Sequence, residues 1–111
     1  MKQTINLYEF RDAFNRMDRG DVFSYEGLEI LFNGIEEFEE DTNEEWELDV
    51  IALCCEFSEM HINEIIESYS YMMDENRLED DDSLSYVTEW LNNQTWLLGE
   101  SKPNVFVFRQ F

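Results

Sequence analysis

Residues 25–40 constrain the fold most, because their apolar side chains recur at helical spacing. The apolar positions are Leu28, Leu31, Phe32, Ile35 and Phe38. This repeat of three and four residues predicts one apolar face on an α-helix. Ser24 precedes the segment and has the side chain of a good N-cap. Such a helix has to bury its apolar face, so the chain is expected to form a packed core.

Three further segments show a helical repeat of apolar residues: 7–17, 62–73 and 84–92. Asn6 followed by Glu9 has the spacing of a capping box at the start of the first. Ser83 or Asp82 is a candidate cap for the last. The acidic segment between the second and third, 74–83, is expected to be a loop.

Two regions favour β-structure. Residues 46–55 alternate with a period of two, which predicts a strand whose second half is buried on both faces. Residues 95–111 contain two short apolar runs around a connection with Gly and Pro, as in a hairpin. The expected fold is one α+β domain over residues 1–111, with four helices packed on a small, mostly antiparallel three-stranded sheet.

The charge is strongly negative and unevenly distributed. The 111 residues have a net charge of -20, from 27 Asp and Glu against 7 Lys and Arg. Between Gly20 and Ser101 the only basic residue is Arg77. A hydrophobic content of 43% argues against a disordered acidic tail. Direct binding of nucleic acid or of an anionic membrane needs a basic surface, so both are excluded as expected functions.

Catalytic, metal and cofactor sites are not expected. The single histidine, His61, stands between predicted elements, where a capping or surface role is favoured. The adjacent Cys54 and Cys55 provide no disulfide framework and are interpreted as small buried hydrophobes of the predicted strand. An EF-hand loop beginning at Asp41 would have Trp46 where it needs Gly. With no signal-peptide or membrane segment recognised, a cytoplasmic protein is expected.

The acidic stretch 34–50 is the best candidate for a binding surface. It has nine acidic residues and no Lys or Arg, beyond what solubility needs in a small domain. Helical residues three to four apart advance by about 5 Å, a spacing that loosely approximates backbone phosphates. We therefore expect a surface that competes with DNA for the basic cleft of a DNA-binding protein. Its expected residues are Glu29, Glu36, Glu37, Glu40, Glu44, Glu45, Glu47, Asp49, Asp80, Asp81 and Asp82.

Two alternatives remain open from the residues alone. The acidic face is either a contact surface or merely a solvated one that keeps the protein soluble. In the second case, a protein–protein adaptor function would use aromatic side chains, which are favoured interface anchors. The candidate anchors are Tyr69, Tyr71, Trp90 and Trp96.

The segments FSYEGLEILF (23–32) and EEDTNEEWELDVIALCCEFSE (39–59) resemble a group of small, acidic proteins encoded by bacteriophages. The resemblance covers residues 4–59 and, more loosely, the closing apolar strand. In size and charge the chain is also similar to phage DNA mimics such as the Ocr and ArdA antirestriction proteins and the uracil-glycosylase inhibitor. This similarity implies a target in host defence, of restriction–modification, BREX or CRISPR type, or in DNA repair, reached in the host cytoplasm.

The closing segment NVFVFRQF (104–111) raises the question of self-association. It is apolar on both faces as far as Phe108. An exposed strand edge here would invite pairing with a second copy of the chain. A homodimer through the C-terminal strand is therefore expected, and it would lengthen the negative surface.

Overall fold

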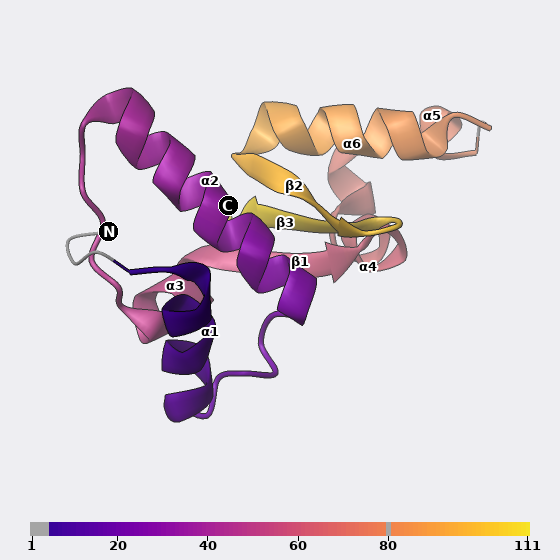
Figure 1. Cartoon of the computed structure of the whole chain (residues 1–111). Helices are drawn as coiled ribbons and strands as arrows, with labels where there is room; N and C mark the ends of the chain where they lie inside the picture. Colours follow the sequence, from indigo (N-terminus) through magenta and orange to yellow (C-terminus); the bar gives the residue numbers. More distant parts are fainter. Residues whose placement is uncertain (1–4, 80) are drawn as a thin grey trace.

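The computed structural model describes residues 5–79 and 81–111 and has the α+β architecture expected from the sequence (Figure 1). Its helices are α1 (Leu7–Arg16), α2 (Tyr25–Thr42), α3 (Val50–Glu56), α4 (Ile62–Tyr69), the 3-10 helix η1 (Ser70–Met72), α5 (Glu75–Leu78) and α6 (Ser83–Gln94). Its strands are β1 (Phe57–His61), β2 (Leu97–Lys102) and β3 (Val105–Arg109). The prediction of a three-stranded antiparallel sheet is confirmed, whereas the four predicted helices are too few, because the described residues form six α-helices.

The sheet has the order β1-β3-β2, and both pairings are antiparallel. β2 and β3 form the predicted hairpin, whose turn contains Asn104 with φ 65°, a conformation that Asn tolerates better than most residues. Phe108 in β3 lies opposite Ser58 of β1 and also opposite Leu97 of β2. The C-terminal strand is therefore the central strand and has no open edge. This corrects the premise of the expected homodimer, since pairing through the edge of this strand is blocked by β1 and β2.

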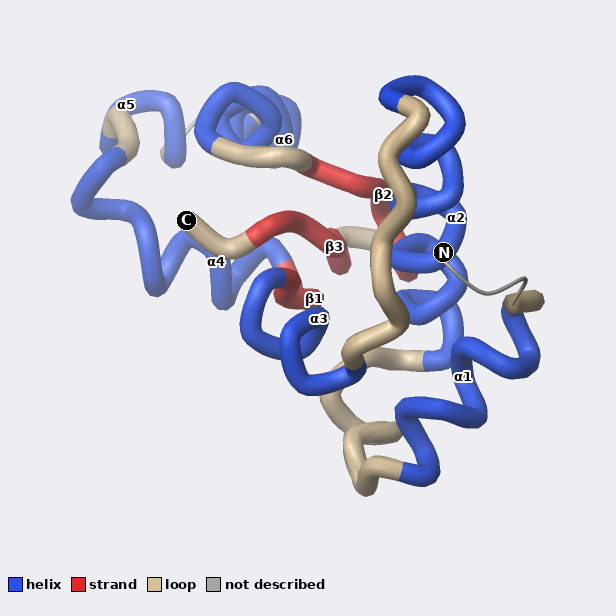
Figure 2. Tube along the Cα trace, turned by 90° about the vertical axis from the view of Figure 1, so that its left-hand side faces the viewer, coloured by secondary structure: helices blue, strands red, loops and turns tan. Residues whose placement is uncertain are grey.

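The central strand separates two apolar cores because its side chains alternate between the faces of the sheet. Val107 packs with the core built around Phe10, Phe14 and Leu31 from α1 and α2. Phe106 and Phe108 belong to the second core, which α4 and α6 cover. Figure 2 shows the resulting layers, with α1 and α2 on one side of the sheet and α4 and α6 on the other.

Helices α1 and α2 begin where their capping residues predict. The Glu9 N–H donates to Asn6 Oδ1 (2.8 Å), and the Asn6 N–H donates to Glu9 Oε1 (3.2 Å). At the start of α2, the Gly27 N–H donates to Ser24 Oγ (2.9 Å). α2 ends at Thr42, and the following residue, Asn43, has φ 59°, the left-handed conformation common after helices.

The predicted strand at 46–55 is wrong. Residues 43–49 have no regular structure, α3 follows, and β1 begins only at Phe57. Asp49 caps α3, because its Oδ1 accepts a hydrogen bond from the Ala52 N–H (3.1 Å). Val50 and Leu53, three residues apart, are the buried residues of this helix. The uniformly apolar run concealed this helical face, because a continuous apolar segment has no informative period.

The cysteines are consequently on a helix, and the expectation that both are buried is wrong. Cys54 is half-buried, Cys55 is exposed, and both are free thiols. Burial raises the pKa of the Cys54 thiol, and the positive charge of Arg19 offsets only part of this rise. A raised pKa leaves little thiolate at neutral pH, so Cys54 is not an activated nucleophile.

The predicted helix over 62–73 divides into α4 and η1, and the expected loop over 74–83 contains the short helix α5. His61 is the N-cap of α4, where its Nδ1 accepts a hydrogen bond from the Asn63 N–H (3.1 Å). The capping role predicted for this histidine is confirmed. α6 begins at Ser83, and Asp82 occupies its N-cap position, but the Asp82 side chain makes no capping hydrogen bond, so the predicted cap is present in position only.

Candidate protein-interaction surface

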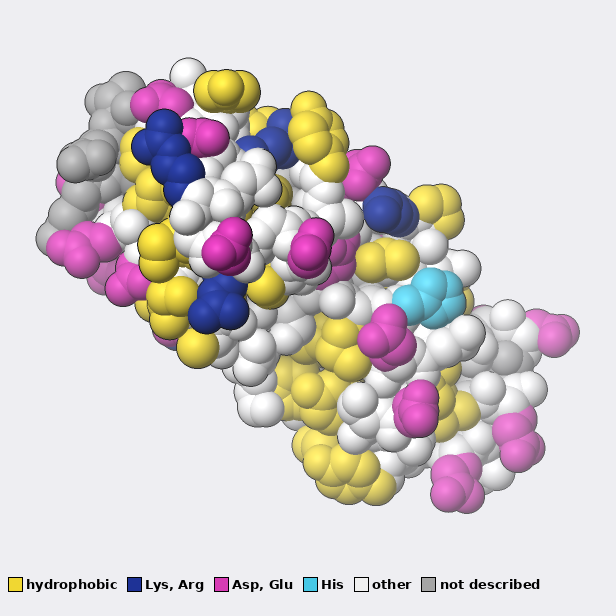
Figure 3. Space-filling model, turned by 90° about the horizontal axis from the view of Figure 1, so that it is seen from below, with side chains coloured by type: hydrophobic (Ala, Val, Ile, Leu, Met, Phe, Trp, Pro, Cys, Tyr) yellow, Lys and Arg dark blue, Asp and Glu magenta, His cyan; other side chains and the backbone are white. Residues whose placement is uncertain are grey.

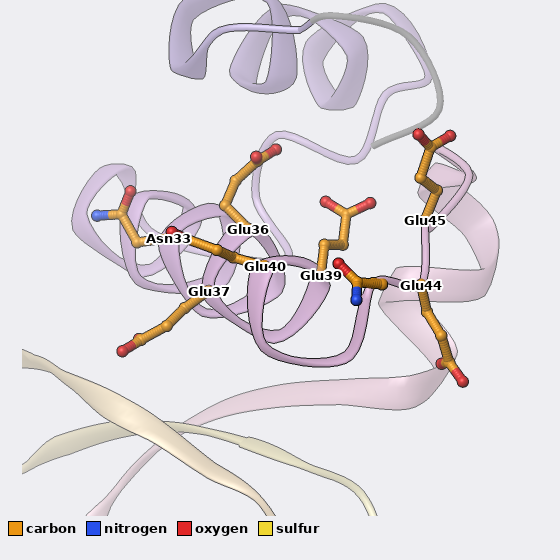
Figure 4. Close-up of a pocket in the computed structure, with 8 residues that line it drawn as sticks. Asn33, Glu36, Glu37, Glu39, Glu40, Glu44 and Glu45 are labelled. Atoms are coloured by element: carbon orange, nitrogen blue, oxygen red, sulfur yellow. The ribbon is translucent and has the colours of Figure 1, made fainter.

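The C-terminal half of α2 and the turn after it surround an open hollow with six glutamates (Figure 4). The hollow has a volume of about 640 Å³, and we call it the acidic hollow. Its lining residues are Asn33, Glu36, Glu37, Glu39, Glu40, Asn43, Glu44 and Glu45. Figure 4 shows Glu36 and Glu39 pointing to one side of α2 and Glu37 to the other, toward the strands. None of these described lining residues is basic, so the hollow presents negative charge in several directions.

The turn after α2 is tied back to the helix, which places Glu44 and Glu45 beside it. Glu39 Oε2 accepts a hydrogen bond from the backbone N–H of Trp46 (2.7 Å). The Trp46 ring packs edge-on against Phe38, with ring centroids 5.9 Å apart. The left-handed Asn43 reverses the chain between these anchors. The acidic residues of the turn are therefore held against a packed element.

The charge arrangement is unfavourable for the isolated protein. The last turn of α2 has no basic residue and contains Glu39, Glu40 and Asp41. Carboxylates at a helix C-terminus oppose the negative end of the helix dipole, and like charges at neighbouring helical positions repel one another. A cationic partner placed against this surface would relieve both effects.

The basic side chains lie elsewhere and are largely paired. The ion pairs are Arg11–Glu29 (3.7 Å), Arg16–Asp12 (2.8 Å), Arg77–Asp82 (3.8 Å), Lys102–Glu26 (3.8 Å) and Arg109–Glu56 (3.1 Å). Figure 3 shows the face that carries α1, where Lys and Arg side chains lie among Asp and Glu. Four of these pairs join exposed side chains and contribute only about 0–1 kcal/mol each to stability, whereas the Arg11 side chain is largely buried. None of the paired basic side chains lines the acidic hollow, so they do not offset its negative charge.

Five of the predicted site residues meet at the acidic hollow: Glu36, Glu37, Glu40, Glu44 and Glu45. Glu29 lies near the start of α2, beside Arg11. Glu47 and Asp49 line a separate hollow of about 430 Å³ next to α1, together with Arg16. These three carboxylates are thus not part of the acidic hollow.

The predicted residues at the start of α6 are separated from the rest. Figures 1 and 2 show α5 and the start of α6 at the opposite end of the molecule from the C-terminal end of α2. Asp81 is exposed there, and Asp82 pairs with Arg77. Asp80 lies outside the described residues. The predicted surface therefore divides into two regions, of which only the α2 region forms a hollow with the other predicted glutamates.

Sequence reasoning missed Glu39 as a residue of the site. It belongs to the same acidic run, but nothing in the sequence distinguishes it from Glu40. Its hydrogen bond joins positions seven residues apart across an irregular turn, a contact that helical periodicity does not predict. Glu39 both lines the acidic hollow and holds its second segment in place.

The aromatic residues considered for an adaptor function fall into two groups. Tyr69 stacks on Phe111 (ring centroids 4.8 Å apart) and lies 6.1 Å from Trp90. Tyr71 is 81% exposed. We call Tyr69, Tyr71 and Trp90, together with Phe111, the aromatic group. Trp96 lies apart from it, since it packs against the half-buried Phe38 and the buried Phe57 on the α2 side. The C-terminal Phe111, which the sequence interpretation did not include, belongs with Tyr69 and Trp90.

A part-buried carboxylate, Glu59 of β1, joins the start of α2 to the sheet. It accepts hydrogen bonds from the Ser24 N–H and Oγ–H (2.6 Å each) and from the Ser101 hydroxyl. Burial by itself would raise the pKa of Glu59, but these hydrogen bonds and the charge of Lys102 outweigh it, so the pKa is lowered. A Cβ at Gly27 would lie 2.5 Å from Glu59 Oε1, so glycine permits this close approach. We assign Glu59 a structural role, because its oxygens are occupied by these donors.

Residues 5–79 and 81–111 provide neither a metal-binding cluster nor a membrane-spanning helix. Within these ranges, His, Cys, Asp and Glu form no group of three suited to holding a metal ion. The same ranges contain no helix whose length and apolarity would let it cross a membrane. No protein-family model, curated protein or solved structure matches this chain.

Proposed function

We propose that this protein is a DNA mimic that inhibits a DNA-binding host protein. The glutamates that line the acidic hollow would contact the basic cleft of that protein in place of DNA phosphates. One observation carries the proposal. Six glutamates from two segments surround a single hollow lined by no described basic residue, while five of the six described Lys and Arg pair with carboxylates elsewhere. A surface of one sign steers an oppositely charged partner and aligns it on contact.

The proposed mechanism is stoichiometric and needs no cofactor. Glu36 and Glu40 are one helical turn apart, which corresponds to about 6 Å along α2. Phosphates on one DNA strand advance about 3.4 Å per nucleotide, so one turn of α2 corresponds to about two nucleotides. The protein would compete directly with DNA, and its charge would accelerate association with the cleft.

The target class follows from the resemblance to acidic phage proteins and DNA mimics. We propose a restriction–modification, BREX or CRISPR-type protein, or a repair enzyme, encountered in the host cytoplasm. Because the two acidic regions are separate, the proposed contact uses only one of them. It is centred on the C-terminal half of α2 and residues 44–45, whereas Asp81 and Asp82 lie outside it.

The test is affinity capture from nuclease-treated bacterial lysate, followed by elution with duplex DNA. A basic cleft that holds the acidic hollow should release the protein when duplex DNA is added, and the captured protein should itself bind DNA. Capture of only proteins that duplex DNA does not displace would contradict the proposal.

A second candidate function is that of an adaptor that binds through the aromatic group. The exposure of Tyr71 and the 47% exposure of Phe111 next to Tyr69 and Trp90 favour it. An aromatic contact depends little on ionic strength. The adaptor reading therefore predicts a partner that remains bound at high salt and in the presence of DNA.

A further inference from the structure

A further open hollow, of about 680 Å³, lies between α6 and β2. We call it the α6–β2 groove. Its lining residues are Leu84, Ser85, Thr88, Glu89, Asn92, Leu97, Glu100 and Phe106. The groove shares no lining residue with the acidic hollow, and the proposed function leaves it unused.

The groove is partly apolar because α6 leaves some of its apolar side chains accessible. Val87 and Leu91 are buried against the sheet, whereas Leu84, one turn before Val87, is 41% exposed. Leu97 from β2 is half-buried, and Phe106 from β3 is 5% exposed. Leu84 and Leu97 are therefore the accessible apolar side chains, and the buried Phe106 ring lies at the bottom of the same hollow. This arrangement can accept a large apolar side chain from another molecule.

Two carboxylates border the same groove from different elements. Glu89 on α6 has no hydrogen-bond or ion-pair partner within the described part of the chain. Glu100 on β2 accepts a hydrogen bond from the Asn104 N–H through Oε2 (2.9 Å), and its Oε1 remains available to a ligand. The described lining includes no Lys or Arg. Any ligand that covers the apolar side chains must therefore lie close to two negative charges.

We propose that the α6–β2 groove binds a partner segment in which one large aromatic side chain is flanked by Lys or Arg. Charge complementarity selects this occupant. A neutral apolar segment would partly dehydrate Glu89 and Glu100 without pairing them, which is unfavourable. A second copy of this chain, with a net charge of -20, would bring like charge to the groove. The binding mode does not depend on DNA mimicry, since it uses neither α2 nor residues 44–45.

The experiment is an NMR titration of the full-length protein at physiological ionic strength with two blocked peptides. One has the sequence Lys-Lys-Trp-Lys-Lys, and the other replaces its Trp by Ala. The Trp peptide should bind at least about fivefold more tightly, because burial of an indole adds to the same electrostatic attraction. Its amide shift changes should centre on residues 84–89 and 97–100.

Variants locate the binding and separate it from general attraction. Leu84→Ser should reduce the affinity for the Trp peptide to that for the Ala peptide, because Leu84 is the most exposed apolar side chain that lines this groove. Glu40→Gln, in the acidic hollow, should weaken both peptides equally and preserve their ratio. Should Leu84→Ser fail to fold, the exposed Glu89→Gln serves instead and should weaken the Trp peptide more than Glu40→Gln does.

Three results would overturn the proposal. They are equal affinities for the two peptides, shift changes confined to residues 36–45, and absence of binding by the Trp peptide. Each would mean that the groove has no preference for an aromatic side chain between cations. None of them bears on capture of a DNA-displaceable target through the acidic hollow.

Discussion

The carboxylate of Glu39 accepts a hydrogen bond from the backbone N–H of Trp46, at 2.7 Å, across the turn that follows α2. This contact makes two segments with many like charges into one surface. Trp46 is half-buried among Phe38, Phe57 and Trp96. The hydrogen bond and the ring contacts together hold Glu44 and Glu45 against the last turn of α2.

We expect Glu39→Ala to loosen this turn and to destabilise the protein by about 1–2 kcal/mol, because a hydrogen bond to a carboxylate is lost. Glu39→Gln should retain most of the stability, since its amide oxygen can still accept from Trp46. Urea unfolding measures the stability, and amide hydrogen exchange at Trp46 reports the turn. Glu40→Ala is the matched control, because it removes a neighbouring charge that has no such bond. Equal effects of Glu39→Ala and Glu40→Ala would contradict the assigned role of Glu39.

Neutralising the acidic hollow should separate folding from binding. The five-residue variant changes Glu36, Glu37, Glu40, Glu44 and Glu45 to Gln. Its stability should be unchanged or slightly higher, because helix propensity is similar and repulsion is reduced. Its affinity for the target should fall by on the order of several kcal/mol, as measured by calorimetry.

The matched control removes the same amount of charge from the α4–α6 side of the molecule. Its substitutions are Glu67→Gln, Glu75→Gln, Glu79→Gln, Asp81→Asn and Glu89→Gln. Under the proposed function this control should retain most of the binding, because only the long-range attraction is reduced. Equal loss in both variants would show that net charge alone matters, whereas a fully active hollow variant would favour the adaptor function.

Ionic strength should affect the target complex strongly. The Debye length falls from about 8 Å at physiological ionic strength to about 3 Å at 1 M. We therefore expect the association rate to decrease steeply with salt, as measured by stopped-flow fluorescence. A complex formed through Tyr69, Trp90 and Phe111 should show little change over the same range.

The Glu59 carboxyl should make stability depend on pH. Its folded-state pKa is lowered, so its contribution is complete above the unfolded-state pKa, about 4.3. It is lost as the pH falls through the folded-state pKa. Glu59→Gln should therefore lower the free energy of unfolding at pH 7 by about 1–3 kcal/mol through weakened hydrogen bonds. The difference from wild type should shrink in acid, as followed by urea unfolding at pH 7 and pH 3, whereas Glu89→Gln should show no such pattern.

Local signals in the sequence were sufficient for the helical elements with clear caps. Asn6 with Glu9 and the Ser24 side chain mark the starts of α1 and α2, because a cap is satisfied by amides within three residues. The same locality explains why five of the predicted glutamates meet. Glu36, Glu37 and Glu40 share one helix, and Glu44 and Glu45 follow within one turn of chain.

Tertiary structure decided the elements that lacked a local signal. The run from Val50 to Cys55 is apolar throughout, so its period was uninformative and the cap at Asp49 was overlooked. The two-faced apolar character of residues 105–108 was recognised, but a strand buried on both faces belongs in the middle of a sheet, where β1 and β2 enclose β3.

The sequence by itself determined the fold class, the capped helices, the hairpin and the concentration of acidic residues on α2, since each depends on neighbours along the chain. Only the tertiary structure decided which of the other predicted carboxylates lie apart from those five glutamates. It separated Asp81 and Asp82 from Glu36 and Glu37 by placing α6 and the C-terminal half of α2 at different ends of the sheet. It also tied Glu39 to Trp46, because contacts between residues distant along the chain depend on how the elements pack around β3.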